Sequence, residues 1–181
     1  MNWISKFIKP KIASLFKKKT SESDQVLWTT CECKNLIYKE DLQKNLNCCP
    51  KCGAHHKLTC TERFKTFFDN EEFSLISTPV PKDDPINFVD KKKYTDRLKL
   101  AREITKQDDA VAISTGKVNN IDVTVGAQDF RFIGGSFGAA SGEAFIHGIQ
   151  HAIDNKNPFI FFSCSGGQRM MESSIALMQM S

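Results

Sequence analysis

The chain has 181 residues, of which 40% are hydrophobic and 25% charged, a composition typical of a globular protein with a sizeable core. This length suffices for one ordinary domain and a small additional module. The longest apolar run, Phe159–Phe162, is far too short to cross a membrane. The formal net charge is +4, but it is unevenly placed: residues 1–57 carry eleven lysines and five acids, whereas the remainder is slightly acidic.

Residues 1–25 are expected to form a basic arm and linker. The first nineteen residues hold six lysines and no acid, and apolar residues such as Trp3 and Phe7 recur at roughly helical spacing. We interpret this segment as a solvated arm. An amphipathic surface helix, a transit peptide or a nucleic-acid-binding arm would share its composition, although transit peptides favour arginine and this segment has none.

Residues 26–60 are expected to form a zinc-ribbon module. Six of the seven cysteines lie here, and four of them form the tight pairs Cys31-Glu-Cys33 and Cys49-Pro-Lys-Cys52. Two such pairs about fifteen residues apart suit one structural Zn²⁺ in a tetrahedron of thiolates. An odd cysteine count without a signal peptide argues against a disulfide scaffold.

Other residues of this module offer alternative ligands. Cys48 competes with Cys49 as the third ligand, but Cys49 gives the better knuckle spacing. His55 or His56 could replace a cysteine, although four thiolates already fill a structural site. We therefore interpret Cys48 and Cys60 as packing residues and the two histidines as surface residues.

The apolar spacing predicts a strand over 36–38 and helices over 41–46, 62–69 and 90–107. The helix over 62–69 is expected to bury Phe64, Phe67 and Phe68. The helix over 90–107 is expected to present one apolar face, made of Tyr94, Leu98, Ala101 and Ile104. Three prolines make 77–87 an extended connection.

Residues 61–181 are expected to form the main domain, whose later part has an α/β order of elements. The pattern predicts strands over 110–115 and 121–127, a turn over 116–120 between them, and a helix over 143–155. The apolar run 158–164 predicts a strand buried on both faces. A final helix is expected directly after Gly166 and Gly167, with its apolar positions at Met170, Ile175, Leu177 and Met178. No residue that ends helices closes this pattern, which indicates a sequence cut in mid-domain.

The turn Ser165-Gly166-Gly167-Gln168-Arg169 is the first candidate for chemistry. Glycine permits close approach of a ligand to the backbone, and the first N–H groups of a helix have no internal partner. Because these groups lie at the positive end of the helix dipole, we expect the N–H groups of Gly167 and Gln168 to bind a developing oxyanion. A tight turn without a ligand is an equally open interpretation.

The stretch Gly134-Gly135-Ser136-Phe137-Gly138 is the second candidate. It is neither a P-loop nor a dinucleotide-binding loop, because no Gly-Lys-Ser/Thr follows and the glycine spacing differs. It suits either close backbone packing or a wall against which a thioester and its pantetheine arm can lie. His147 and His151 lie four residues apart on one predicted helix, but no third ligand is evident, so we interpret them as surface residues.

Several blocks of the sequence carry a resemblance to a known family, in the family's order. The blocks are Trp28–Cys33, Leu42–Cys52, Lys93–Leu98, Gly134–Gly138, Ser165–Met170 and Ser174–Met180. Together they resemble the carboxyltransferase β subunit of bacterial-type acetyl-CoA carboxylase. The first cysteine pair is one residue shorter than in the family, Gln168 stands where a small residue is usual, and the family's C-terminal part is lacking.

The resemblance implies an α/β, crotonase-like fold, a superhelix of ββα turns that is incomplete at the C-terminus and preceded by the four-cysteine zinc ribbon. It implies transfer of the carboxyl group from carboxybiotin on a carrier protein to acetyl-CoA, which gives malonyl-CoA for fatty acid synthesis. Gly166, Gly167 and Gln168 would then be catalytic. The residues expected to contact substrate are Gly134, Gly135, Ser136, Gly138 and Arg169.

The same resemblance implies partners: a carboxyltransferase α subunit in an α2β2 assembly, the biotin carboxyl carrier protein and biotin carboxylase. A cytoplasmic location without a membrane span is expected. Because the family builds its site from two subunits, residues 1–181 alone are expected to be inactive. A β subunit for another acyl-CoA such as propionyl-CoA is one alternative, although such relatives typically lack the zinc ribbon. A zinc-ribbon nucleic-acid-binding protein is another, favoured by the basic first third.

Overall fold

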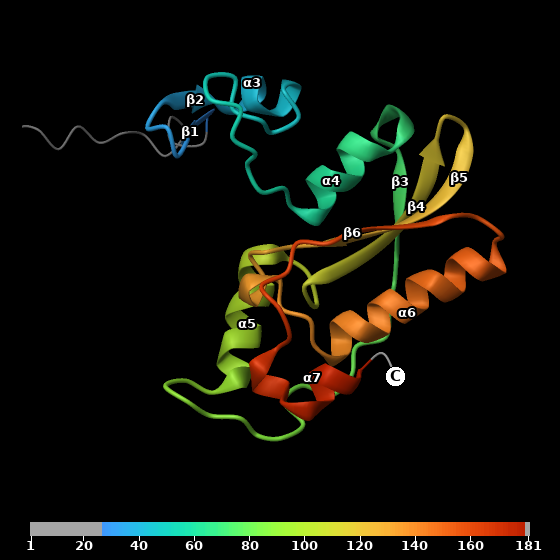
Figure 1. The fold of residues 1–181 in the computed structure, drawn as a ribbon. Helices are drawn as coiled ribbons and strands as arrows, with labels where there is room; N and C mark the ends of the chain where they lie inside the picture. The colour runs from blue at the N-terminus through green and yellow to red at the C-terminus, as the bar shows by residue number, and fades with distance from the viewer. Residues whose placement is uncertain (1–26, 180–181) are drawn as a thin grey trace, which may run out of the picture. The chain divides into compact units, whose positions relative to one another are not determined.

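The computed structural model describes residues 27–179, so the expected basic arm lies outside the described residues. The chain divides into two compact units, Met1–His56 and Lys57–Ser181 (Figure 1). The expected module boundary at residue 60 falls at the start of helix α4 (Cys60–Phe67), within the second unit. In the described part of the chain, no helix is both long enough and apolar enough to cross a membrane.

The first unit is a small hairpin followed by one short helix. Its elements are β1 (Trp28–Thr30), β2 (Leu36–Tyr38) and α3 (Lys39–Lys44), and the two strands pair antiparallel. The strand predicted over 36–38 is confirmed, and the helix predicted over 41–46 begins and ends slightly earlier. Among the described residues of this unit, the buried core consists of Ile37 and Leu42 beside the cysteines Cys31 and Cys49. So small an apolar core indicates that the unit depends on its cysteine chemistry to fold.

The second unit is built on a four-stranded sheet with the order β3-β4-β5-β6. Its strands are β3 (Phe73–Ile76), β4 (Val111–Val118), β5 (Ile121–Gln128) and β6 (Phe159–Phe162). Its helices are α4, α5 (Tyr94–Thr105), α6 (Ala139–Asp154) and α7 (Ser174–Met178). β3, β4 and β5 pair antiparallel, whereas β6 returns through α6 to pair parallel with β5. This parallel crossover brings the carboxyl ends of β5 and β6 to one edge of the sheet.

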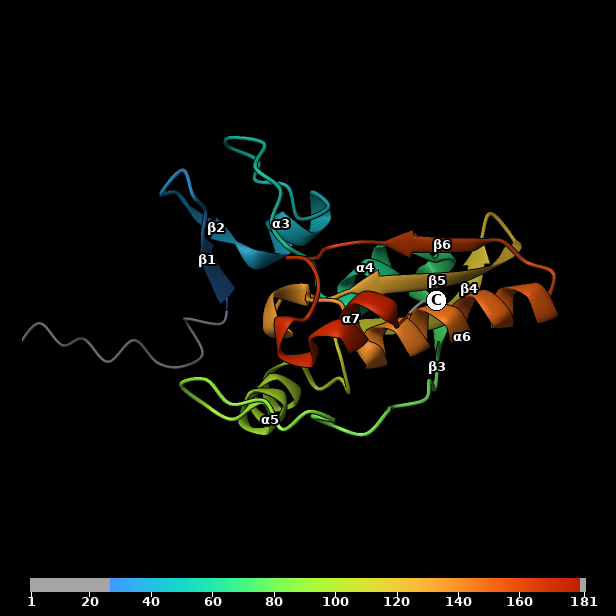
Figure 2. The ribbon, with the colours of Figure 1, turned by 60° about the horizontal axis from the view of Figure 1, so that its bottom comes forward.

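Helices α4 and α6 cover opposite faces of this sheet (Figure 2). Side chains alternate along a strand, so Val125 of β5 packs with Phe64 of α4, while Ile113 of β4 packs with Ala144 of α6. Of the phenylalanines expected to be buried, Phe64 and Phe68 are buried and Phe67 is half-buried against the same core.

A second apolar cluster lies under helix α5, whose Tyr94, Leu98 and Ala101 pack together with Ala110, Phe132 and Met171. The predicted face is wrong at one position, because Ile104 is 55% exposed while Thr105 is buried. Thr105 follows Tyr94 by about three full turns and therefore lies on the same face of the helix as Tyr94. Ile104 lies roughly 80° away from Tyr94 around the helix axis. The helix begins at Tyr94, later than the predicted residue 90.

The predicted β4–β5 hairpin is confirmed with a tighter turn than expected. The strands continue to Val118 and from Ile121, so that only Asn119 and Asn120 form the turn. Both have positive φ, which is the conformation of a type I′ hairpin and is tolerated by asparagine. The Asp69 carboxylate accepts both of their N–H groups, at 3.1 and 3.0 Å.

Two predictions for the last third are wrong. β6 is not buried on both faces: its four residues are all half-buried, and among the described residues it forms the edge of the sheet. The final helix does not begin at the glycines. A 3₁₀ turn, Met170–Glu172, comes first, and Ser173 at a φ of 52° separates it from α7. Helix α6 also begins at Ala139, earlier than the predicted residue 143.

Candidate functional site

Four cysteine sulfurs gather in the first unit. Cys31, Cys33, Cys49 and Cys52 place these atoms within 4.8 Å of one another. The sulfurs of Cys31 and Cys52 lie 3.6 Å apart, and those of Cys33 and Cys49 lie 3.9 Å apart. A tetrahedral site with Zn–S bonds of about 2.3 Å requires sulfur–sulfur distances of about 3.8 Å. The four thiols therefore fit a structural zinc ion.

Local hydrogen bonds explain how the short Cys31-Glu-Cys33 pair still forms a knuckle with both sulfurs on one side. The N–H of Cys31 donates to the carbonyl of Asn35 at 3.0 Å, and the N–H of Lys34 donates to the carbonyl of Cys31 at 2.9 Å. The Asn35 amide also donates to the Cys33 sulfur, and hydrogen bonds from Asn35 lower the pKa of Cys33 to about 6. The loop thus favours the thiolate form that a zinc ligand needs.

The alternative zinc ligands have other contacts. The Cys48 sulfur lies 3.1 Å from Nδ1 of His55, and neither residue belongs to the four-sulfur cluster. Cys60 lies in the second unit, where its thiol donates to the carbonyl of Ala127 at 3.1 Å. Burial raises the pKa of Cys60 to about 11. Cys60 is therefore a packing residue of the second unit.

The two glycine stretches lie side by side at the carboxyl ends of β5 and β6. The N–H of Gly166 donates to the carbonyl of Gly134 at 2.9 Å, and the N–H of Phe137 donates to the carbonyl of Gly167 at 2.9 Å. The N–H of Arg169 returns to the carbonyl of Phe137 at 2.8 Å. The carboxyl edge of parallel strands is where open α/β sheets bind ligands.

The expected oxyanion turn has one free donor and one occupied donor. The N–H of Gly167 donates to the Ser165 hydroxyl at 3.0 Å, so this donor is occupied in the structure. For the N–H of Gln168, no hydrogen-bond acceptor is found among residues 27–179. Gly167 has a φ of 116°, and a Cβ built on it would meet no atom within 4 Å. The turn is therefore open to a ligand, although it is not the start of a helix as predicted.

The Gln168 side chain does not fill this opening. In the amide orientation that satisfies its neighbours, Nε2 of Gln168 donates to the carbonyls of Phe137 at 3.1 Å and Ala176 at 2.6 Å. A glutamine in place of the family's small residue thus ties the turn to α7.

Three residues of the Gly134–Gly138 stretch, Gly135, Ser136 and Gly138, pack against the segment from Cys164 to Glu172. A Cβ at Gly135 would lie 2.1 Å from the carbonyl oxygen of Cys164, and one at Gly138 would lie 2.7 Å from the Glu172 carboxylate. The Ser136 hydroxyl accepts a hydrogen bond from Arg169 at 3.1 Å. Of the glycines expected to contact substrate, Gly134 alone faces open space.

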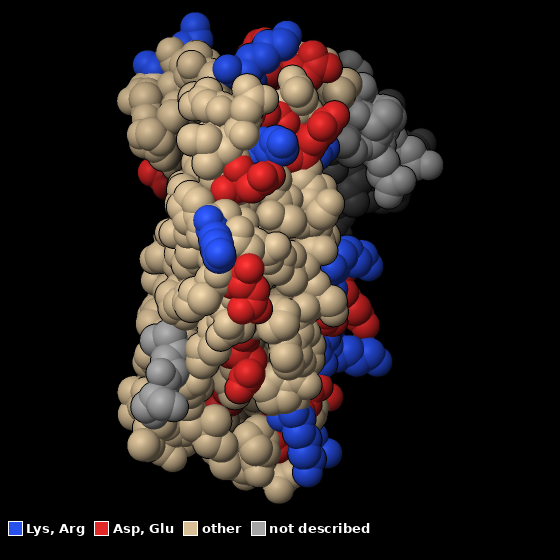
Figure 3. Space-filling view, turned by 90° about the vertical axis from the view of Figure 1, so that its right-hand side faces the viewer, with Lys and Arg blue, Asp and Glu red and all other residues tan. Residues whose placement is uncertain are grey.

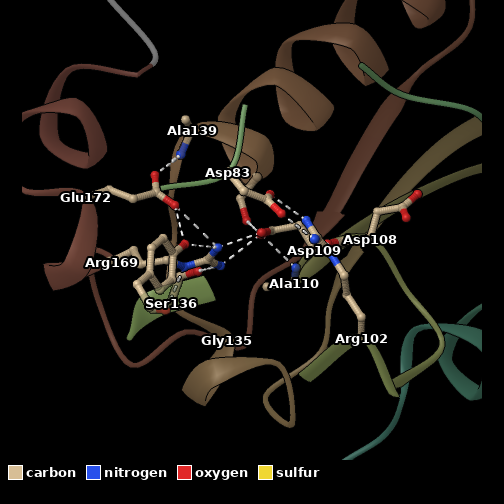
Figure 4. Close-up of polar contacts among 12 residues, drawn as sticks. Asp83, Arg102, Asp108, Asp109, Ala110, Gly135, Ser136, Ala139, Arg169 and Glu172 are labelled. Carbon is tan, nitrogen blue, oxygen red and sulfur yellow. Dashed lines mark hydrogen bonds and ion pairs between the residues drawn. The ribbon is translucent and has the colours of Figure 1, made fainter. Parts of the chain in front are cut away.

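Arg169 does not have the geometry expected of a substrate-binding arginine. Its side chain is fully buried, and all five N–H donors have acceptors within the second unit (Figure 4). Two donors bind Asp109 at 2.5 and 2.8 Å, and one binds the Tyr94 hydroxyl at 3.2 Å. The other two bind the hydroxyl and the carbonyl of Ser136, at 3.1 and 2.6 Å. The guanidinium has no donor left for a substrate.

The predicted surface role of the two helical histidines is inaccurate for His151. Its Nδ1 lies 3.0 Å from the hydroxyl of Thr124, which donates to the amide oxygen of Asn157 at 2.9 Å. This chain of contacts joins α6 to β5 and to the turn before β6.

Comparison with known proteins supports the resemblance. Residues 28–52 match the family described as the acetyl-CoA carboxylase zinc finger domain, and residues 84–181 match the carboxyl transferase domain. The acetyl-coenzyme A carboxylase carboxyl transferase subunit beta of Pelagibacter ubique is 45% identical over 99% of this chain and 59% of that protein. The corresponding subunit of a Jannaschia species is 41% identical over 99% of this chain and 56% of that protein. The chain thus spans somewhat less than three fifths of the length of these two relatives.

A solved structure agrees at the level of the fold. The transcarboxylase 12S structure with hydrolysed methylmalonyl-coenzyme A bound has a TM-score of 0.50 and 23% identity, and the match covers 67% of this chain and 21% of that one. It confirms the expected carboxyltransferase, crotonase-like fold. The matches along the sequence are closer and extend over both units. The chain belongs to the carboxyl transferase domain family, and over 99% of its length it is similar to acetyl-CoA carboxylase carboxyl transferase β subunits.

Proposed function

We propose that the full-length protein transfers a carboxyl group from carboxybiotin to acetyl-CoA and forms malonyl-CoA. The observation that carries this proposal is the presence, in one chain, of the acetyl-CoA carboxylase zinc finger domain and the carboxyl transferase domain. The zinc ribbon favours acetyl-CoA over propionyl-CoA as the substrate. Its four cysteines hold one structural zinc ion that stabilises the first unit.

The oxyanion turn would stabilise the enolate of the thioester. Removing a proton from the methyl group of acetyl-CoA moves negative charge onto the thioester oxygen, to which the free N–H of Gln168 can donate a hydrogen bond. Rotation of the Ser165 side chain about its Cα–Cβ bond would release the N–H of Gly167 as a second donor. Each such donor typically contributes about 10²–10³ in rate.

The reaction balances without a side-chain base. The C–H bond of the methyl group breaks and its proton goes to the ureido nitrogen of biotin, while the methyl carbon forms a C–C bond to the carboxyl carbon that biotin releases. Gly134 and the open side of Gly167 would leave room for the thioester beside the two loops. A carboxyltransferase α subunit would complete the biotin side, in an α2β2 assembly served by the biotin carboxyl carrier protein and biotin carboxylase in the cytoplasm.

Surface charge on one face of the described residues does not favour the nucleic-acid alternative. On the face in Figure 3, lysines and arginines alternate with acidic side chains and do not gather into a basic stripe. A nucleic-acid-binding surface would concentrate positive charge along one groove or helix.

The test uses the full-length chain assembled with its α subunit. Gly167→Ala and Gly167→Val keep the N–H but place progressively larger groups in the open space beside it. We expect malonyl-CoA formation to fall by about 10² or more for the valine variant, with a smaller loss for alanine and unchanged zinc content. Full activity in a folded valine variant would show that the oxyanion binds elsewhere. Turnover of propionyl-CoA faster than acetyl-CoA would refute the substrate assignment.

A further inference from the structure

Two carboxylates that sequence analysis did not single out enclose Arg169. Asp109 is 5% exposed, and besides Arg169 its carboxylate accepts the hydroxyl of Ser141 at 2.5 Å and the N–H of Ala110 at 2.8 Å. Glu172 is also 5% exposed and accepts the Tyr94 hydroxyl at 2.5 Å. Figure 4 shows both carboxylates directed at the guanidinium, from opposite sides.

The cluster carries one positive and two negative charges, and α6 offsets the excess. The Glu172 carboxylate accepts the N–H of Ala139 at 2.6 Å, the first residue of this sixteen-residue helix. A helix N-terminus carries about half a positive charge, which stabilises an anion there. Burial lowers the pKa of Arg169, but the hydrogen bonds and charge of Asp109 outweigh this effect and hold the pKa above its usual value.

Stability alone does not account for such a cluster. Removing three charged groups from water costs free energy, and replacing a buried ion pair with well-packed apolar residues is often neutral or stabilising. What an apolar cluster could not provide is direction: the planar fork of arginine fixes the groups that it binds. We therefore infer that the cluster serves to orient the groups that Arg169 binds.

Arg169 orients the peptide between Ser136 and Phe137. Its Nη2 binds the carbonyl of Ser136 at 2.6 Å. In a trans peptide the C=O and N–H point in opposite directions, so the N–H of Phe137 points away from Arg169, and it donates to the carbonyl of Gly167. The same rule applies to the peptide between Gly167 and Gln168: its carbonyl faces Phe137, so the N–H of Gln168 points away from the Gly134–Gly138 stretch.

We propose that Asp109 and Glu172 are positioning residues for carboxyl transfer: they hold the Arg169 fork, and through it the two glycine loops, so that the N–H of Gln168 faces the substrate. This inference rests on the proposed function. Asp109 holds the fork directly through two hydrogen bonds. Glu172 acts through the Tyr94 hydroxyl and the first turn of α6.

The experiment uses the full-length chain assembled with its α subunit. Asp109→Asn replaces one acceptor oxygen with a donor facing Arg169. Arg169→Lys keeps the charge but loses the fork. Tyr94→Phe removes only the hydroxyl and serves where a stronger variant fails to fold. The matched control is Asp83→Asn, which breaks the ion pair of Asp83 with Arg102, an arginine–carboxylate pair that is partly exposed and makes no hydrogen bond to either glycine loop in the described residues.

We expect Asp109→Asn and Arg169→Lys to lower kcat by about 10- to 100-fold while KM for acetyl-CoA stays within about threefold, because misplaced groups affect the transition state more than binding. Tyr94→Phe should show a smaller loss in the same direction. Asp83→Asn should keep the wild-type kcat. Zinc content should be unchanged in all four variants.

Hydrogen exchange separates this inference from the proposed function. The amides of Phe137, Ala139 and Arg169 should exchange faster in Asp109→Asn than in Asp83→Asn, whether or not the assembly makes malonyl-CoA. An inactive wild-type assembly would overturn the proposed function alone. If the amide exchange rates in both glycine loops were unchanged in Asp109→Asn, the positioning role would be overturned. If Asp109→Asn does not fold, unchanged rates in Tyr94→Phe would overturn it instead. So would a loss of activity that merely follows the loss of folded protein.

Discussion

Two neighbouring glycines allow backbone strain and steric overlap to be measured separately. Gly134 and Gly135 have nearly equal φ, 66° and 63°, in the left-handed region that disfavours any side chain. A Cβ on Gly134 would meet no atom within 4 Å. A Cβ on Gly135 would lie 2.1 Å from the carbonyl oxygen of Cys164, which is too close for any contact. Alanine at each position therefore tests the same strain with and without a clash.

The two substitutions should differ in magnitude for this reason. The left-handed conformation costs alanine about 1–2 kcal/mol at either position. At Gly135 the Cys164 carbonyl must also move by about 1 Å, and such overpacking typically costs about 1–3 kcal/mol. That movement disturbs Gln128, which donates to the carbonyl of Gly135 at 2.5 Å and accepts the N–H of Cys164 at 3.2 Å. We expect a loss of about 1–2 kcal/mol for Gly134→Ala and about 2–5 kcal/mol for Gly135→Ala.

Thermal unfolding of the two variants, followed by circular dichroism, measures this difference. For a unit of this size, 1 kcal/mol corresponds to roughly 3–5 °C in Tm. Gly135→Ala should therefore unfold several degrees below Gly134→Ala, with the same zinc content in both. Equal Tm values would refute the reasoning. They would show that Gly135 does not lie close enough to the Cys164 carbonyl for a Cβ to clash with it.

Two further predictions concern the zinc ion and the hairpin. Metal analysis should give about one zinc per chain, lost in Cys49→Ser or Cys52→Ser and kept in Cys48→Ser, and retention of zinc in both of the first two variants would contradict the ligand assignment. Hydrogen bonds from the N–H groups of Asn120 and Asn119 lower the pKa of Asp69 below its ordinary 3.8, so its contribution to stability is present above about pH 4 and is lost as the pH falls through the lowered pKa. The Tm difference between the wild type and Asp69→Ala should therefore be constant near neutral pH and narrow below about pH 4; a difference that does not change with pH would argue against the role of the carboxylate.

Short-range patterns gave the parts of the fold and site that were predictable from the sequence. The four zinc ligands were identifiable because each pair closes within one turn, so that spacing alone sets the geometry. The β4–β5 hairpin was identifiable because the asparagines at 119 and 120 separate two β-rich runs. The glycine turns were found for the same reason, since glycine marks places where backbone approaches backbone.

Predictions that depended on the environment of a segment were less accurate. The run Phe159–Phe162 is apolar enough for a strand buried on both faces, yet in the described chain it is a half-buried edge strand. Apolar composition reports that a strand is shielded from water but not which segment shields it. The break at Ser173 was missed because apolar residues on both sides of it keep a helical spacing, while its positive φ leaves no mark in the pattern.

The buried cluster around Arg169 was missed because its members are far apart in sequence and ordinary in type. Sixty residues separate Arg169 from Asp109, and Asp109 follows Gln107 and Asp108 in a polar run that resembles a surface loop. The sheet register nevertheless determines their meeting. Val111, at the start of β4, pairs with Gln128, at the carboxyl end of β5, and β6 runs parallel to β5. The residues just before β4 and just after β6 therefore reach the same edge of the sheet, which is where the two glycine loops lie. Once strand order and direction are known, a carboxylate before β4 and an arginine after β6 can be predicted to pair, whereas neither residue's neighbours in the sequence predict it.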